Sequence, residues 1–137
     1  MPTKKAKVEL MRAVPLFARC SKRELADVVA LSYEHEVGPG ETIVQEGDVA
    51  DAFYAVLEGE AKVTRGRRTL ARLGPGDFFG EIALVARSPR TASVTATGSA
   101  RLLVVNARSF RALLGRSPAV QQKVLEALAE RLAATTL

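Results

Sequence analysis

Cysteine, histidine and tryptophan are almost missing from this sequence of 137 residues. It contains one cysteine, Cys20, one histidine, His35, and no tryptophan. A single cysteine cannot form an internal disulfide, and one cysteine with one histidine does not make the ligand set of a zinc site. These scarcities argue against a disulfide scaffold, a metal centre and a Cys–His nucleophile. We therefore expect neither catalytic nor metal-binding residues.

Long apolar runs are lacking as well. No segment approaches the roughly 18 apolar residues of a membrane span, and residues 1–14 lack the apolar region and cleavage site of a secretory signal. We expect no membrane span in this chain and a cytoplasmic location. The apolar fraction of 47% is typical of a globular protein, and a chain of this length can bury one core. Residues 1–137 are therefore predicted to form a single domain.

The net charge of +5 is concentrated at the two ends of the chain. Residues 1–23 carry seven basic residues against one acid, and residues 101–137 carry six against two. The central residues 24–100 carry seven basic residues against twelve acids. A DNA-binding protein is expected to present a continuous basic face. We therefore expect no direct DNA binding.

The N-terminal part of the sequence has helical periodicity. An apolar stripe begins at Val8 and is predicted to end at Pro15, because proline interrupts helices. Ser21 and Glu24 have the spacing of a capping box, in which each side chain bonds the other residue's backbone amide. This box predicts a second helix over residues 22–31.

Helical periodicity returns after residue 106. Asn106 is predicted to cap a helix that Gly115 ends, and Ser117 followed by Pro118 has the pattern of a new helix start. The last helix is predicted to present one apolar stripe. Its members are Val120, Val124, Leu125, Leu128 and Leu132.

Residues 32–106 consist of short β-type segments separated by glycine turns. Apolar pieces such as AFYAVL and AKVTR lie between glycines that recur about every seven to twelve residues. This spacing is typical of an antiparallel sandwich or barrel, and we count about eight strands. The sequence therefore predicts an α+β fold.

The stretch FGEIALVARSPRTASV, residues 79–94, is too long for a tight turn. One helical turn after Gly80 would present free backbone amides to an anion. Arg90 would add a planar cation suited to phosphate, and Thr91 a hydroxyl donor. Glu81 then has a role if it accepts a hydrogen bond from a sugar hydroxyl. Alternatively, Glu81 and Arg90 pair with each other as an ordinary surface ion pair.

The whole pattern resembles the cyclic nucleotide-binding domain of the catabolite activator protein, protein kinase regulatory subunits and cyclic-nucleotide-gated channels. The matching stretches are GETIVQEGDVADAFYAVLEGEAKV at 40–63, LGPGDFFGEIAL at 73–84 and PRTASVTA at 89–96. The resemblance implies an antiparallel eight-stranded, jelly-roll-like β-roll at 32–106, with a phosphate cassette at 79–92 that holds a short helix. Helices at 1–31 would precede the roll, and hinge and lid helices at 107–134 would follow.

The resemblance also implies site residues. Glu81 would bind the ribose 2′-hydroxyl and Arg90 the cyclic phosphate. The implied cassette contacts are Phe79, Gly80, Glu81, Ile82, Ala83, Arg90, Thr91 and Ala92. Pocket-lining candidates are Val63, Leu70 and Leu73, which could equally be plain core residues. Lid candidates are Leu128, Arg131 and Thr135, although Arg131 could simply face solvent.

The function that the resemblance implies is reversible binding of a 3′,5′-cyclic mononucleotide by a sensor or regulatory module. Cyclic AMP is favoured over cyclic GMP, although Thr91 after Arg90 also resembles cyclic-GMP-selective domains. We expect no enzyme activity and no cofactor. The partner is expected to be a separate effector protein or a missing output domain, and a homodimer is possible. The alternative is a degenerate, non-binding module that serves protein interaction or dimerisation.

Overall fold

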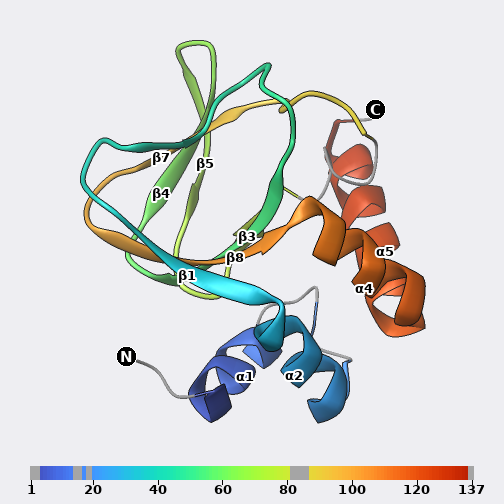
Figure 1. Ribbon diagram of the computed structural model, residues 1–137. Coiled ribbons are helices and arrows are strands. Elements are labelled where there is room, and N and C mark those ends of the chain that lie inside the picture. Colours follow the sequence, from blue (N-terminus) through green and yellow to red (C-terminus); the bar gives the residue numbers. More distant parts are fainter. Residues whose placement is uncertain (1–3, 14–16, 18–19, 81–86, 136–137) are drawn as a thin grey trace.

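The computed structural model describes residues 4–13, 17, 20–80 and 87–135. Within these residues, two helices precede a series of strands and two helices follow it (Figure 1). The elements are α1 (Lys4–Ala13), α2 (Lys22–Ala30), β1 (Ser32–Val37), β2 (Thr42–Val44), β3 (Ala52–Glu58), β4 (Ala61–Arg65), β5 (Arg68–Leu73), β6 (Phe78–Phe79), β7 (Ser93–Ala96), β8 (Ala100–Asn106), α4 (Ala107–Arg116) and α5 (Pro118–Thr135). The short helix expected after Gly80 lies outside the described residues.

The strands form two four-stranded sheets, with the orders β1-β8-β3-β6 and β2-β7-β4-β5. Within each sheet, every pair of neighbouring strands is antiparallel. Figure 1 shows the two sheets facing each other as a roll, with α1, α2 and α4 near the sheet that contains β1, β8 and β3. The predicted α+β fold with an antiparallel eight-stranded β-roll is therefore confirmed.

Strand β3 is buried on both of its faces. All six residues from Ala52 to Leu57 are buried. Because successive side chains of a strand point to opposite faces, they divide between two apolar clusters. Phe53, Ala55 and Leu57 join the cluster formed with the helices, and Ala52, Tyr54 and Val56 join the cluster inside the roll. The sheet that contains β3 thus has helices on one face and the interior of the roll on the other.

The capping box at the start of α2 is present as predicted. The Ser21 hydroxyl accepts a hydrogen bond from the Glu24 amide, and the Glu24 carboxylate accepts one from the Ser21 amide. The helix then runs to Ala30 and buries Leu25, Val28 and Val29 against the outer cluster. The predicted stop of the first helix at Pro15 lies outside the described residues.

The predicted end of the next helix at Gly115 is wrong. Asn106 caps α4 as expected, by accepting from the Ser109 amide at 2.8 Å. The helix continues through Gly115 to Arg116, and the Ser117 amide still donates to the Leu113 carbonyl at 2.9 Å. A glycine inside a helix costs only about 1 kcal/mol relative to alanine. Burial of Phe110 and Leu113 offsets that cost.

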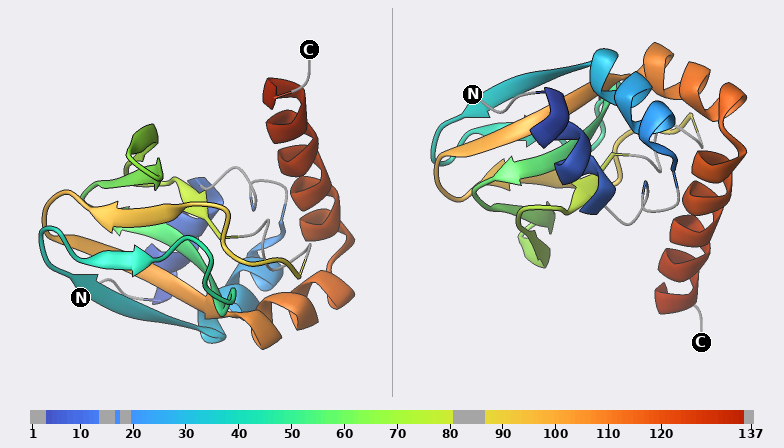
Figure 2. Two further views of the ribbon diagram at one scale, coloured as in Figure 1. Left: turned by 90° about the horizontal axis from the view of Figure 1, so that it is seen from above. Right: turned by 90° about the horizontal axis from the view of Figure 1, so that it is seen from below.

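The break between α4 and α5 therefore lies at Ser117. Its hydroxyl accepts from the Val120 amide at 3.3 Å, so Ser117 caps α5 as predicted. Val120 is fully buried, whereas Leu125 is 60% exposed and does not share its buried face. Figure 2 shows α5 as a rod that leaves the end of α4 at an angle and extends beside the roll.

Candidate functional site

Arg90 is the centre of the candidate site. Its side chain is only 4% exposed. Nη1 donates to the Gly80 carbonyl at 3.1 Å, and Nη2 donates to the Ala52 carbonyl at 2.6 Å. Two neutral oxygens from the chain segments on either side thus orient the guanidinium. Because a carbonyl carries no net charge, these two bonds orient the guanidinium without neutralising its positive charge.

Among the residues that the structure describes, two more contact the guanidinium. Asp51 lies 3.4 Å from Nη2, but its side chain is 78% exposed, so water screens this ion pair strongly. Cζ of Arg90 lies 5.8 Å from the ring centroid of Tyr54, within cation–π range. Tyr54 in turn stacks on Phe79, with ring centroids 4.9 Å apart. Burial raises the pKa of Tyr54, with a further contribution from Asp51, so its ring stays neutral.

Gly80 has no room for a side chain. Its φ is +97°, and a Cβ atom built there would lie 2.8 Å from Arg90 Nη1 and 2.9 Å from the Ala52 oxygen. The sequence suggests a glycine that lets a ligand approach the backbone. The structure gives a further reason, because the arginine and a carbonyl of the protein itself need that space.

The backbone around Arg90 is held by the loop between β2 and β3. The Arg90 amide donates to the Asp48 carbonyl at 2.8 Å, and the Gly47 amide donates to the Arg90 carbonyl at 2.9 Å. Both backbone groups of Arg90 are therefore paired within the protein. These two bonds fix the position of its Cα.

The β4–β5 turn also reaches this segment. Arg65 Nε donates to the Thr91 carbonyl at 3.0 Å. The Glu46 carboxylate accepts from the Gly66 amide at 3.1 Å, while the Glu46 amide donates to the Ser93 hydroxyl at 2.9 Å. The residues on both sides of Ala92 are thus tied to two other loops.

The predicted pocket-lining residues occupy different environments. Val63 and Leu73 are half-buried and pack against the cluster inside the roll. Leu70 is 43% exposed, like its neighbours in β5, and it is the extra residue where the pairing with β4 shifts register. Val63 and Leu73 thus fit either a pocket wall or a plain core, and Leu70 is on the surface of the edge strand.

The remaining predicted contacts are only partly described. Phe79 is buried, Ala92 is half-buried and Thr91 is exposed. Glu81, Ile82 and Ala83 lie outside the described residues. The lid candidates belong to α5, of which the backbone is described at these positions. They are Leu128, Arg131 and Thr135.

Four contributors to the Arg90 environment have no signal in the sequence. Ala52 and Tyr54 of β3 and Asp51 just before it reach Arg90, and Arg65 reaches Thr91 from β4. These contacts depend on which strands become neighbours. Spacing along the chain does not reveal that.

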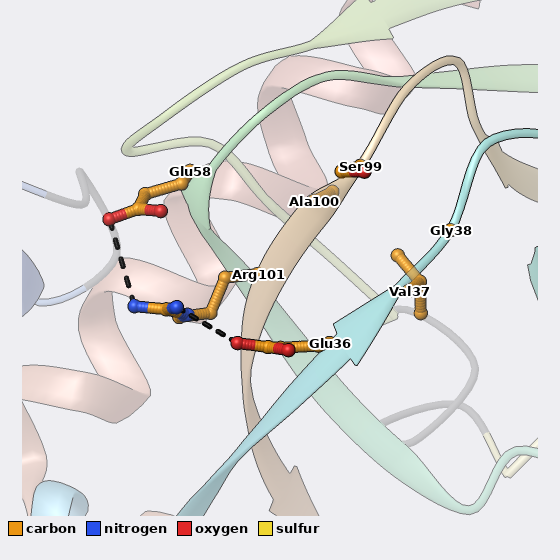
Figure 3. A pocket seen from close by; sticks show the side chains of 7 residues that line it. All are labelled: Glu36, Val37, Gly38, Glu58, Ser99, Ala100 and Arg101. Carbon is orange, nitrogen blue, oxygen red and sulfur yellow. Dashed lines mark hydrogen bonds and ion pairs between the residues drawn. The ribbon is translucent and has the colours of Figure 1, made fainter. Parts of the chain in front are cut away.

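A cavity of about 400 Å³ lies at the other end of the roll (Figure 3). Arg101, near the start of β8, lines it and is held by Glu36 at 2.8 Å and Glu58 at 3.8 Å. The Arg90 site lies near the opposite end of β8, where Asn106 pairs with Ala52. A separate cavity of about 170 Å³ reaches Arg90 itself, beside the β2–β3 loop.

The described residues contain no group of three or more His, Cys, Asp or Glu side chains arranged for a metal ion. Among the helices that the structure describes, none has the length and apolarity to cross a membrane.

The thiol of Cys20 is buried, and burial together with the nearby Glu24 carboxylate raises its pKa to about 11.

Comparisons with known proteins point to one family. The family described as "Cyclic nucleotide-binding domain" matches residues 34–117. A cyclic nucleotide-gated potassium channel of Rhizobium etli is 32% identical over 90% of this chain, and a cAMP-dependent protein kinase regulatory subunit of Mycosarcoma maydis is 38% identical over 74% of it. The matches cover 34% and 21% of those proteins, so the chain spans about a third of their length or less.

A solved structure shares the fold. It is the regulatory domain of Toxoplasma gondii PKA with cAMP, with a TM-score of 0.84 and 26% identity over 93% of this chain and 50% of that one. Sequence and fold therefore agree on one assignment. This chain belongs to the cyclic nucleotide-binding domain family.

Proposed function

We propose that this chain binds a 3′,5′-cyclic mononucleotide reversibly, cyclic AMP in preference to cyclic GMP, and acts as a sensor. The observation that carries the proposal is the buried, oriented guanidinium of Arg90. In this proposal Arg90 binds the cyclic phosphate and Glu81 accepts a hydrogen bond from the ribose 2′-hydroxyl. Gly80, Ile82 and Ala83 contribute backbone contacts.

The electrostatics of Arg90 support a phosphate ligand. A buried cation is unfavourable unless a counter-charge and hydrogen bonds compensate for lost hydration. Its two shortest described bonds go to neutral carbonyls, and Asp51 lies at the solvent-exposed edge. A phosphate accepts paired N–H bonds and carries a negative charge to match the guanidinium. A singly charged cyclic phosphate therefore suits the site.

The preference for cyclic AMP is supported by the relatives. The kinase regulatory subunit is named cAMP-dependent, and the Toxoplasma structure contains cAMP. Thr91 leaves room for cyclic GMP, because its hydroxyl could reach a guanine amino group. The proposal therefore specifies a preference and not exclusive binding.

Signalling in this proposal uses the break at Ser117. A sensor needs two states with different ligand affinities, and α5 is joined to α4 at that single cap residue. We propose that α5 closes over the base and presents Leu128, Arg131 or Thr135. The output would pass to an effector protein or to further parts of a longer polypeptide. A cytoplasmic location and a possible homodimer belong to the same proposal.

Calorimetric titration with cyclic AMP and cyclic GMP tests the binding function. We expect tighter binding of cyclic AMP, and a loss of about 100-fold for Arg90→Leu, because a charge-assisted contact is removed. Arg67→Leu is the matched control, since it removes one exposed arginine of the β4–β5 turn. Unchanged binding by Arg90→Leu would reject the phosphate contact.

The same titration addresses the rival function. If the wild type bound neither nucleotide, the chain would be a non-binding module of this fold. Chromatography of the nucleotide after long incubation adds a second readout. We expect it to be recovered unchanged, since the proposal is binding without catalysis.

A further inference from the structure

We propose that Arg65 is a positioning residue that holds Thr91 in place within the nucleotide site. This inference rests on the proposed function. Arg65 ends β4, and its Nε donates to the Thr91 carbonyl at 3.0 Å, across 26 positions of sequence. Thr91 directly follows Arg90. The contact therefore acts on the Thr91–Ala92 peptide, one residue beyond Arg90.

The contact lies where the sheet stops supporting this segment. The pairing of β4 with β7 ends at Thr64 and Ser93. Thr91 and Ala92 lie beyond that last pair, so no hydrogen bond of this ladder fixes them. The Arg65 side chain reaches past the end of the ladder and supplies one. It thus extends the hold of β4 by two residues toward Arg90.

A second connection ties the same two segments together. Glu46 accepts from the Gly66 amide through its carboxylate and donates to the Ser93 hydroxyl through its amide. We call Glu46, Arg65, Gly66, Thr91 and Ser93 the hairpin clamp. Figure 1 shows the β4–β5 hairpin, the loop before β3 and the entry to β7 at the same end of the roll.

The clamp acts on an otherwise exposed residue. Thr91 is exposed, and an exposed residue outside regular structure loses conformational freedom when it binds a ligand. Fixing its carbonyl beforehand reduces that loss. Arg65 therefore raises affinity through Thr91, and not as a distant charge.

Arg67 is a control that separates positioning of Thr91 from a long-range effect of charge. It lies in the turn that follows Arg65 and is also exposed, and the structure shows no contact between it and the described part of the cassette segment. Arg65→Met and Arg67→Met each remove one positive charge. A long-range effect of charge would weaken binding in both variants alike, whereas the clamp predicts a loss only in the first.

The test is a double-mutant cycle measured by calorimetry with cyclic AMP and cyclic GMP. We expect Arg65→Met to weaken binding about five- to tenfold, and Arg67→Met by less than about twofold. In a Thr91→Ala background, Arg65→Met should cost less than about twofold, because the side chain it positions is gone. Ser93→Ala removes the hydroxyl that accepts a hydrogen bond from the Glu46 amide. It should weaken nucleotide binding about as much as Arg65→Met does.

Each result is decisive for the role of Arg65. Equal losses in Arg65→Met and Arg67→Met, or an undiminished loss in the Thr91→Ala background, would overturn it. Thermal unfolding of each variant shows whether a loss of affinity only follows a loss of stability. Failure of the wild type to bind either nucleotide would instead overturn the proposed function, and would be seen before any variant is compared.

Discussion

The hydroxyl of Ser117 donates a hydrogen bond to the carboxylate of Glu24, and 93 positions of sequence separate the two residues. Ser117 is 2% exposed and marks the break between α4 and α5. Glu24 belongs to the capping box of α2. Helix α2 is thus joined by a hydrogen bond to the point from which α5 departs.

Removing this hydroxyl should destabilise the protein. For Ser117→Ala we expect a loss of about 1–3 kcal/mol in the free energy of unfolding, because a partly buried hydrogen bond to a carboxylate is lost. Urea denaturation followed by circular dichroism measures it. Ser99→Ala, at an exposed position before β8, is the control and should change stability little. Equal stability of the two variants would contradict the role of Ser117.

The ionisation of Glu24 should make this contribution depend on pH. Hydrogen bonds from Ser117, and then from the Ser21 backbone, lower the pKa of Glu24 below its ordinary value of 4.5. A carboxyl with a lower pKa in the folded state stabilises the protein above its unfolded pKa, and this contribution is lost as the pH falls through the folded pKa. The stability difference between wild type and Glu24→Gln should therefore shrink on acidification.

That difference can be measured by denaturation at several pH values between about 6 and about 3. Other acids titrate in both proteins, so their effects largely cancel in the difference. Parallel stability curves across this range would show that Glu24 has the same pKa in the folded and unfolded chains.

Gly80→Ala should disturb the Arg90 site more than it strains the backbone. Gly76 has a similar φ, +89°, but no atom lies within 4 Å of a Cβ built there. We expect each variant to lose about 1–2 kcal/mol from the unfavourable φ. Gly80→Ala should lose more, because its methyl group collides with Arg90 and the Ala52 carbonyl. Thermal unfolding gives the comparison, and equal losses would argue against the crowding.

The thiol of Cys20 should react slowly in the native protein. It is 4% exposed and its pKa is raised to about 11, so at pH 8 only about one thiol in a thousand is ionised. Labelling with a disulfide reagent should accelerate sharply in denaturing urea. Rapid labelling without denaturant would mean that the helices around Cys20 open frequently.

Signals confined to a few neighbouring residues predicted the structure well. The capping box of Ser21 and Glu24 and the cap Asn106 depend on side chains that bond amides three residues away, and all are present. Gly115 failed as a stop signal, since a glycine favours a helix end without requiring one. Its neighbours Phe110 and Leu113 bury enough surface to carry the helix onward.

The candidate site was predicted less completely. Arg90 and Gly80 were identified from the sequence, and the structure places the Gly80 carbonyl on the Arg90 guanidinium. Tyr54 and Arg65 could not be identified, because their contacts arise from strand pairing between distant segments. The proposed role of Glu81 stays a prediction.

The double burial of β3 places the side chain that contacts Arg90 and the side chain that contacts α4 on adjacent residues. Tyr54 lies under the Arg90 guanidinium, while its neighbour Phe53 stacks on Phe110 of α4 with ring centroids 5.2 Å apart. A tilt of the peptide between residues 53 and 54 would therefore change the contact with Arg90 and the contact with α4 together. In this chain the packing that connects Arg90 to α4 runs through the thickness of a single strand, and not around the loops at its ends.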